Sequence, residues 1–141
     1  MKNLLKLAGA SGLLCLLFVM PASAQITNAL SFTTTFAFYA GNTKMPAGSY
    51  RVTPSTFGSS ILEIQSSTGS HSAFIEYVPT QADTGHKATD VAFKKYGTTD
   101  FLDRLWVGGQ QFGMQIEPSK VEQKLAEGGQ PQTHSVPAKG Q

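Results

Sequence analysis

Residues 31–39 read SFTTTFAFY, a stretch in which one face of a strand can be recognised directly. The bulky members stand at every second position: Phe32, Thr34, Phe36 and Phe38. Successive side chains of a strand point to opposite faces, so this spacing predicts a half-buried strand. The following MPAG has Pro46 and Gly48 where a type I turn favours them. Because Tyr50 and Val52 resume the alternation, we expect the chain to reverse there into a second strand.

The chain beyond this turn has the same character up to residue 116. Further strands are expected at residues 60–65, 72–78, 90–96, 100–107 and 112–116. Gly97 lies in the turn of the third strand pair, and the polar stretch 79–89 is expected to be a surface loop. Aromatic, Ser, Thr and Gly residues together are typical of strands and turns. The prediction is an all-β fold: a single β-sandwich or partly open barrel of about seven antiparallel strands.

One short C-terminal helix is expected over residues 119–127. Ser119 and Glu122 have capping-box spacing, and Gly128 can take the left-handed conformation that ends a helix. Two apolar residues four positions apart form its expected docking face: Val121 and Leu125. Residues 129–141 contain two prolines and few apolar residues, which favours a disordered polar tail. The β-rich globular domain is therefore expected to span residues 31–128.

The first 24 residues have the pattern of a cleavable secretory signal peptide. Lys2 and Lys6 precede an apolar run that stops at Pro21, and the run is shorter than the ~20 residues that cross a bilayer. Ala22 and Ala24 are the small residues that signal peptidase requires. We expect cleavage after Ala24, a mature chain that begins at Gln25 with a lead-in over residues 25–30, and export to the periplasm or the medium. The alternative is an uncleaved N-terminal anchor.

Cleavage at this position changes the composition of the chain. Cys15 is removed, and because Leu14 precedes it, Cys15 does not fit a lipoprotein site. The mature chain would have no cysteine, no disulfide and no transmembrane anchor. Loss of Lys2 and Lys6 leaves nine of the 11 basic residues against nine acidic ones. A neutral chain with scattered basic residues argues against nucleic acid as a partner.

The sequence offers no catalytic, cofactor-binding or metal-binding motif, so none of these sites is predicted. His86 lies between Asp83 and Asp90, which we interpret as a solvated loop and not as a metal site. His71 is interpreted as a turn residue. The glycine-rich stretch 108–113 follows a strand without opening a helix, and is therefore expected to be a hairpin turn and not a phosphate-binding loop.

Three functions stay open. The first is a non-catalytic binding or structural module, with its aromatic residues filling the core. Its partner would be unknown, and a component of the cell envelope is one such module. The second is a lipocalin-like carrier of a small apolar ligand, for which the aromatic residues would line a cavity. The third is a hydrolase that uses two of four dispersed carboxylates. These are Glu63, Glu76, Asp100 and Asp103. An outer-membrane barrel is disfavoured because the expected strands are mostly shorter than about ten residues.

Several sequence blocks resemble a family of small exported hypothetical β-rich proteins of environmental Gram-negative bacteria. The blocks are FAFYAG at 36–41, MPAGSYRV at 45–52, VAFKKYG at 91–97, FL at 101–102 with Trp106, and PSKVE at 118–122. The resemblance runs from about residue 30 to residue 127 and implies a structural role for the shared apolar and glycine positions. Lys94 and Lys95 stand where the family has His-Arg, so the resemblance implies no catalytic histidine and no particular activity. The PAG-x-Y-x-V block also resembles turn-strand units of transthyretin-like modules.

Overall fold

The computed structural model describes residues 29–81 and 87–140. The expected signal peptide with Ala22, Ala24 and Gln25, most of the lead-in 25–30, and the loop with Asp83 and His86 lie outside the described residues. Ten strands and one helix are formed by the described residues. They are β1 Leu30–Thr34, β2 Phe38–Ala40, β3 Thr43–Met45, β4 Gly48–Pro54, β5 Ile61–Ser66, β6 Ser72–Gln81, β7 Asp90–Tyr96, β8 Thr99–Trp106, β9 Phe112–Ile116, α1 Lys120–Ala126 and β10 Gln132–Gly140.

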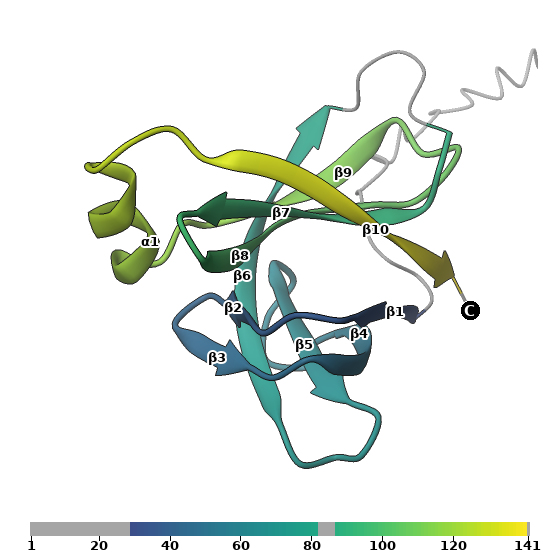
Figure 1. The fold of residues 1–141 in the computed structure, drawn as a ribbon. Helices are drawn as coiled ribbons and strands as arrows, with labels where there is room; N and C mark the ends of the chain where they lie inside the picture. The colour runs from purple at the N-terminus through teal and green to yellow at the C-terminus, as the bar shows by residue number, and fades with distance from the viewer. Residues whose placement is uncertain (1–28, 82–86, 141) are drawn as a thin grey trace, which may run out of the picture.

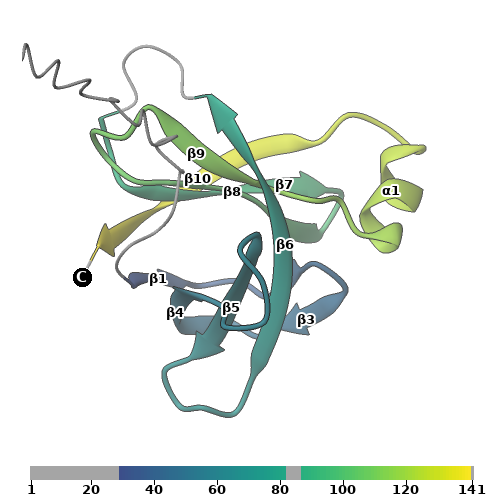
Figure 2. The ribbon, with the colours of Figure 1, turned by 180° about the vertical axis from the view of Figure 1, so that it is seen from behind.

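Eight of these strands close into an antiparallel barrel. The order around it is β1, β4, β5, β6, β9, β8, β7 and β10, and β10 pairs back to β1. The β2–β3 hairpin is attached through parallel pairing of β2 with β8. Figure 1 shows β7, β8 and β9 above β1, β4 and β5, with the long β6 running between the two groups. The predicted all-β fold with one short helix is confirmed (Figure 2). The finer expectation of a sandwich or partly open barrel of about seven strands is not matched, because β10 pairs with β1 and closes eight strands into a barrel.

Aromatic rings fill the inside of the barrel. Phe38 lies 5.2 Å from Tyr50 and 5.3 Å from Phe93, measured between ring centroids. Phe32 lies 5.6 Å from Tyr50 and 6.2 Å from Phe93. All four are almost fully buried, together with aliphatic residues from every strand of the barrel except β10, whose Val136 and Ala138 pack against them partly buried. Centroid distances of this size are those of packed aromatic pairs, so the rings form a filled core.

The opening stretch SFTTTFAFY folds as two strands instead of the single strand expected. β1 ends at Thr34, whose hydroxyl donates to the Phe36 carbonyl oxygen at 3.0 Å, and β2 begins at Phe38. The chain reverses first at Gly41, which has φ of 60°. Pro46 then connects β3 to β4, where Gly48 is the first residue, and β4 pairs with β1. The Tyr50 hydroxyl donates to the Pro46 carbonyl oxygen and holds this connection.

The expected disordered tail over residues 129–141 is wrong, because residues 132–140 form β10. This strand pairs with β7 through six residues and with β1 through the next three. Pro137, which has no N–H to donate, is the last residue that pairs with β7, just before the strand passes to β1. Along β10 the partly buried side chains are His134, Val136 and Ala138. β10 is therefore held mainly by backbone hydrogen bonds, first to β7 and then to β1, which apolar content does not reveal.

The helix is present, but it docks through a different face from the one expected. Ser119 is the N-cap, and its hydroxyl accepts a hydrogen bond from the Glu122 N–H at 3.1 Å. Glu122 is only 6% exposed, whereas Val121 and Leu125 are 41% and 39% exposed. The expected docking through Val121 and Leu125 is therefore wrong, because an ion pair described below holds Glu122 inward. Gly128 lacks the expected positive φ.

One hairpin turn lies next to this helix, and another lies across the barrel from it. Gly97 has φ of 62° and begins the two-residue turn between β7 and β8. The stretch 108–113 joins β8 to β9, which pair antiparallel, so its interpretation as a hairpin turn is confirmed. Gly113 lies under the Trp106 ring, and a Cβ added there would overlap that ring. β6 extends to Gln81, so the loop expected from residue 79 begins later.

Removal of β10 tests its role in closing the barrel. A chain that ends after Gln130 should lose cooperative thermal unfolding, because β7 and β1 would both have unpaired backbone groups. Circular dichroism and calorimetry measure this. A control chain that ends after Gly140 keeps β10 and should unfold as the full chain does. An unchanged melting temperature for the shorter chain would contradict the closed barrel.

Candidate binding groove on the outside of the barrel

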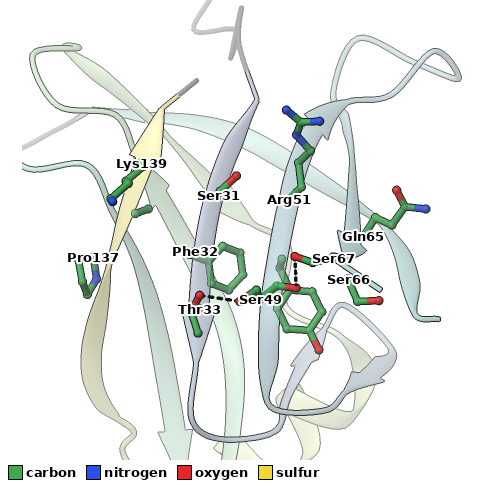
Figure 3. Close-up of a pocket in the computed structure, with 12 residues that line it drawn as sticks. Ser31, Phe32, Thr33, Ser49, Arg51, Gln65, Ser66, Ser67, Pro137 and Lys139 are labelled. Atoms are coloured by element: carbon green, nitrogen blue, oxygen red, sulfur yellow. Dashed lines mark hydrogen bonds between the residues drawn. The ribbon is translucent and has the colours of Figure 1, made fainter. Parts of the chain in front are cut away.

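A groove with a volume of about 820 Å³ crosses the outer face of β10, β1, β4 and β5. Its position follows from strand alternation, because the residues between the buried ones point outward. Strand register aligns these outward residues into a first row, seen in Figure 3. The row consists of Lys139, Ser31, Arg51 and Gln65. One side chain from each of four neighbouring strands therefore contributes to the same line.

A second row lies beside the first and consists of hydroxyl groups. Thr33 on β1 pairs with Ser49 on β4, and their hydroxyl oxygens are 2.9 Å apart. Ser67, which follows β5, donates from its hydroxyl to the Ser49 carbonyl oxygen at 3.1 Å. The backbone N–H of Ser67 donates to the same oxygen at 2.9 Å. The second row is thus fixed in place by the sheet and by its own hydrogen bonds (Figure 3).

The hollow itself results from the way β10 leaves β1. The two strands pair only from Leu30 to Phe32 on β1, whereas β1 continues beside β4 to Thr34. Figure 3 shows β10 bending away from β1 below this point. Pro137 stands on the diverging part of β10 and lines the groove opposite Thr33. The strand that closes the barrel therefore also creates the groove.

A polar cluster under α1 is the second place where titratable groups gather. Lys94 on β7 lies 2.9 Å from the Asp103 carboxylate and 3.9 Å from that of Glu122. Asp103 and Glu122 are both buried. Gln115 on β9 donates to Asp103 Oδ1 at 2.7 Å. The cluster contains residues of β7, β8, β9 and α1, so it attaches α1 to the barrel.

Burial sets the protonation behaviour of this cluster. Desolvation raises the pKa of Glu122, with a smaller contribution from the negative charge of Asp103, and the positive charge of Lys94 only partly opposes this. Burial by itself would lower the pKa of Lys94. The hydrogen bond and charge of Asp103, together with Glu122, outweigh that effect and leave the pKa raised. Lys94 therefore stays charged and neutralises a carboxylate, which is the arrangement of a structural ion pair.

Asp100 and His134 form a separate pair at one end of the barrel. His134 Nε2 lies 2.6 Å from Asp100 Oδ1, and Asp100 is buried. The His134 ring stacks on Phe93 with centroids 5.7 Å apart and meets Phe36 edge-on at 5.0 Å. These contacts tie β10 to β8 across β7. Asp100 also lines a smaller cavity of about 260 Å³ beside α1, together with the exposed Val121.

The structure does not bring the four candidate carboxylates together. Glu63 and Glu76 lie on the outward face of the neighbouring strands β5 and β6, two register positions apart, and β9 separates β6 from β8. Asp100 and Asp103 are on the same strand, yet Asp100 contacts His134 whereas Asp103 contacts Lys94. His71 follows β5 in an exposed loop, where its Nδ1 lies 3.0 Å from the Ser70 hydroxyl. None of the five lines the outer groove.

Sequence reasoning did not select any residue of the groove as functional. The alternation did assign Ser31, Thr33, Ser49 and Arg51 to the outward face of their strands. No signal placed Lys139 beside them, because residue 139 was expected to be disordered. The register between β10 and β1 supplies that information.

The Glu122 pKa gives a stability prediction with a definite sign. A buried carboxyl whose pKa is raised contributes stability below its unfolded pKa of about 4.5, and this contribution is lost as the pH rises through the folded pKa. Glu122→Gln should therefore gain melting temperature relative to the unsubstituted protein between pH 4 and pH 7. Thermal unfolding across that range measures the difference. Equal pH dependence of the two proteins would contradict the assignment.

The described residues set limits on other sites. They contain no group of three His, Cys, Asp or Glu side chains placed to hold a metal ion. Among the same residues, no helix has the length and apolar character needed to cross a membrane. Comparisons with protein-family models, curated proteins and solved structures found no match for this chain. Its function is therefore inferred from the geometry of its own sites.

Proposed function

We propose that this protein is an exported, non-catalytic binding module that binds its ligand in the outer groove across β10, β1, β4 and β5. The observation that supports this most strongly is the alignment of polar side chains from four strands into two rows. Strand register and the hydrogen bonds of Thr33, Ser49 and Ser67 hold the second row in place before a ligand arrives. Such preorganisation reduces the free-energy cost of binding.

The packed interior argues against the lipocalin-like alternative. A carrier of that kind holds its ligand inside the barrel, in a cavity that side chains leave empty. Here Phe32, Phe38, Tyr50 and Phe93 pack against one another in that position. A ligand would have to displace rings that stabilise the fold. The outer groove needs no such rearrangement.

The hydrolase alternative has little support from the acidic residues. Asp103 and Glu122 converge, but they do so on Lys94. Both carboxylates are buried under α1, and neither lines any of the cavities described above. A general acid and a nucleophile must both reach the substrate. This pair of carboxylates is therefore better explained as part of the fold.

Filling the groove with a bulky side chain tests the proposed function. Ser49→Trp places an indole in the second row without entering the core, because Ser49 is exposed. A titration of the labelled protein with alginate, dextran and palmitate, followed by NMR, locates each binding event. We expect a polysaccharide to shift the signals of Thr33, Ser49 and Ser67, and Ser49→Trp to abolish that binding.

A matched control places the same side chain elsewhere. Thr43→Trp on β3 is also at an exposed position and does not line the groove, so it should leave binding unchanged. Shifts confined to core residues such as Phe93 on addition of palmitate would support the carrier and contradict the proposal. The proposal would also fail if none of the three probes perturbed the groove.

A further inference from the structure

We propose that the outer groove binds an extended anionic polysaccharide, in which acidic groups are spaced along a hydroxylated chain. This inference rests on the proposed function, since it names the ligand class of the same groove. The two rows of side chains differ in chemistry, and each row matches one part of such a ligand. The first row supplies positive charge, and the second supplies hydroxyl groups.

The positive charge comes from Lys139 on β10 and Arg51 on β4. Both lie in the first row, on either side of Ser31. They are two strands apart, which corresponds to about 10 Å across the sheet. Both side chains are long and exposed, so they can reach acidic groups spaced along a chain that crosses the strands. The guanidinium of an arginine can bind a carboxylate through two parallel hydrogen bonds, whereas the ammonium of a lysine acts as a point charge.

The described residues that line the groove include no Asp or Glu. The acidic residues next to the lining set are Asp90, which is opposite Pro137 in the register of β7 and β10, and Glu63, which is two residues before Gln65 on β5. The chain expected after cleavage is neutral overall, with nine basic and nine acidic residues in residues 25–141. The groove is therefore a local concentration of positive charge on a neutral protein. Because the chain as a whole is neutral, the attraction of the groove for an anion depends on short-range contacts.

The remaining lining groups can both donate and accept hydrogen bonds. A serine or threonine hydroxyl has one donor and two acceptor positions, and a glutamine amide has both kinds of atom. Ser31, Thr33, Ser49, Ser67 and Gln65 all present such groups in the groove. The hydroxyls of a sugar ring have the same dual character. Neutral parts of a polysaccharide can therefore be bound between the two charged side chains.

Other extended ligands fit the groove less well. A peptide that adds as a strand needs a free sheet edge, whereas β4 and β5 pair on both sides here and β1 lacks its second partner only at Thr33 and Thr34. Single-stranded nucleic acid requires aromatic platforms for its bases, and the outward members of both rows are not aromatic. Recognition of an anionic membrane surface uses clusters of four to eight basic residues, whereas the described part of the chain contributes two to the lining of this groove.

The test compares alginate, a chain of linked uronates, with the neutral polysaccharide dextran. Protein expressed from the full-length sequence is titrated by isothermal calorimetry, with the groove signals followed by NMR. We expect alginate to bind, dextran to bind more weakly, and the double variant Arg51→Ala, Lys139→Ala to lose about tenfold or more in alginate affinity. Raising the salt concentration from about 0.01 M to about 1 M shortens the screening length from about 30 Å to about 3 Å and should weaken alginate binding.

The control removes the same charge from another surface. Lys120→Ala, Lys124→Ala changes two exposed lysines of α1, which does not line the groove, and should retain alginate affinity. Equal loss in both double variants would overturn the anionic-ligand inference. Dextran binding at the groove with an affinity equal to that of alginate, and independent of salt, would overturn it while supporting the proposed function. No perturbation of groove signals by either polysaccharide would contradict both.

Discussion

The structure depends on the pairing of β10 with β7 on one side and with β1 on the other. Without this strand, backbone N–H and C=O groups along six residues of β7 and three residues of β1 would face water at open sheet edges, where aggregation begins. β10 contributes little apolar area, because only Val136 and Ala138 pack partly against the core. The barrel is therefore closed by hydrogen bonds at β10, whereas the rest of it is stabilised mainly by aromatic burial. Pro137 lies where the strand passes from one partner to the other.

Closure at β10 also determines where a ligand can bind. The aromatic core occupies the inside, so the inside is not available without loss of packing. On the outside, β10 brings Lys139 into register with Ser31 and Arg51, and its divergence from β1 hollows the surface between them. The same strand therefore completes the fold and the candidate site. On the opposite side of the barrel, Trp106 packs over Gly113 where β8 meets β9.

Much of the fold could be predicted from local patterns. Alternation identified the buried face of β1, and the positions of β5, β7, β8 and β9 lay within one residue of their observed bounds. The failures have physical causes. β10 was missed because its pairing with β7 and then with β1 uses backbone groups and few apolar residues, and because proline is tolerated at a change of partner. The helix was assigned the wrong face because Glu122 turns inward toward Lys94, which the spacing of apolar residues does not reveal, whereas Val121 and Leu125 stay exposed.

The candidate site was less predictable than the fold because it depends on strand register. A groove made by four strands is a property of their register, and register joins residues more than 100 positions apart in this chain, such as Ser31 and Lys139. Catalytic motifs are short and can be read locally, whereas scattered serines and threonines have no pattern until the strands are aligned. The outward positions of Ser31, Thr33, Ser49 and Arg51 were predictable, whereas that of Lys139 was not. Which residues share a row was not.

Amide hydrogen exchange at residues 132–140 tests the closed barrel most directly. If β10 is part of the barrel, its N–H groups should exchange slowly and at rates similar to those of β7 and β1, because they open only with the sheet. Protection should extend to Lys139, which lies at the edge of the groove. Exchange of residues 132–140 at the rate of an unstructured chain, with β7 and β1 still protected, would contradict the closed barrel and the groove that depends on it.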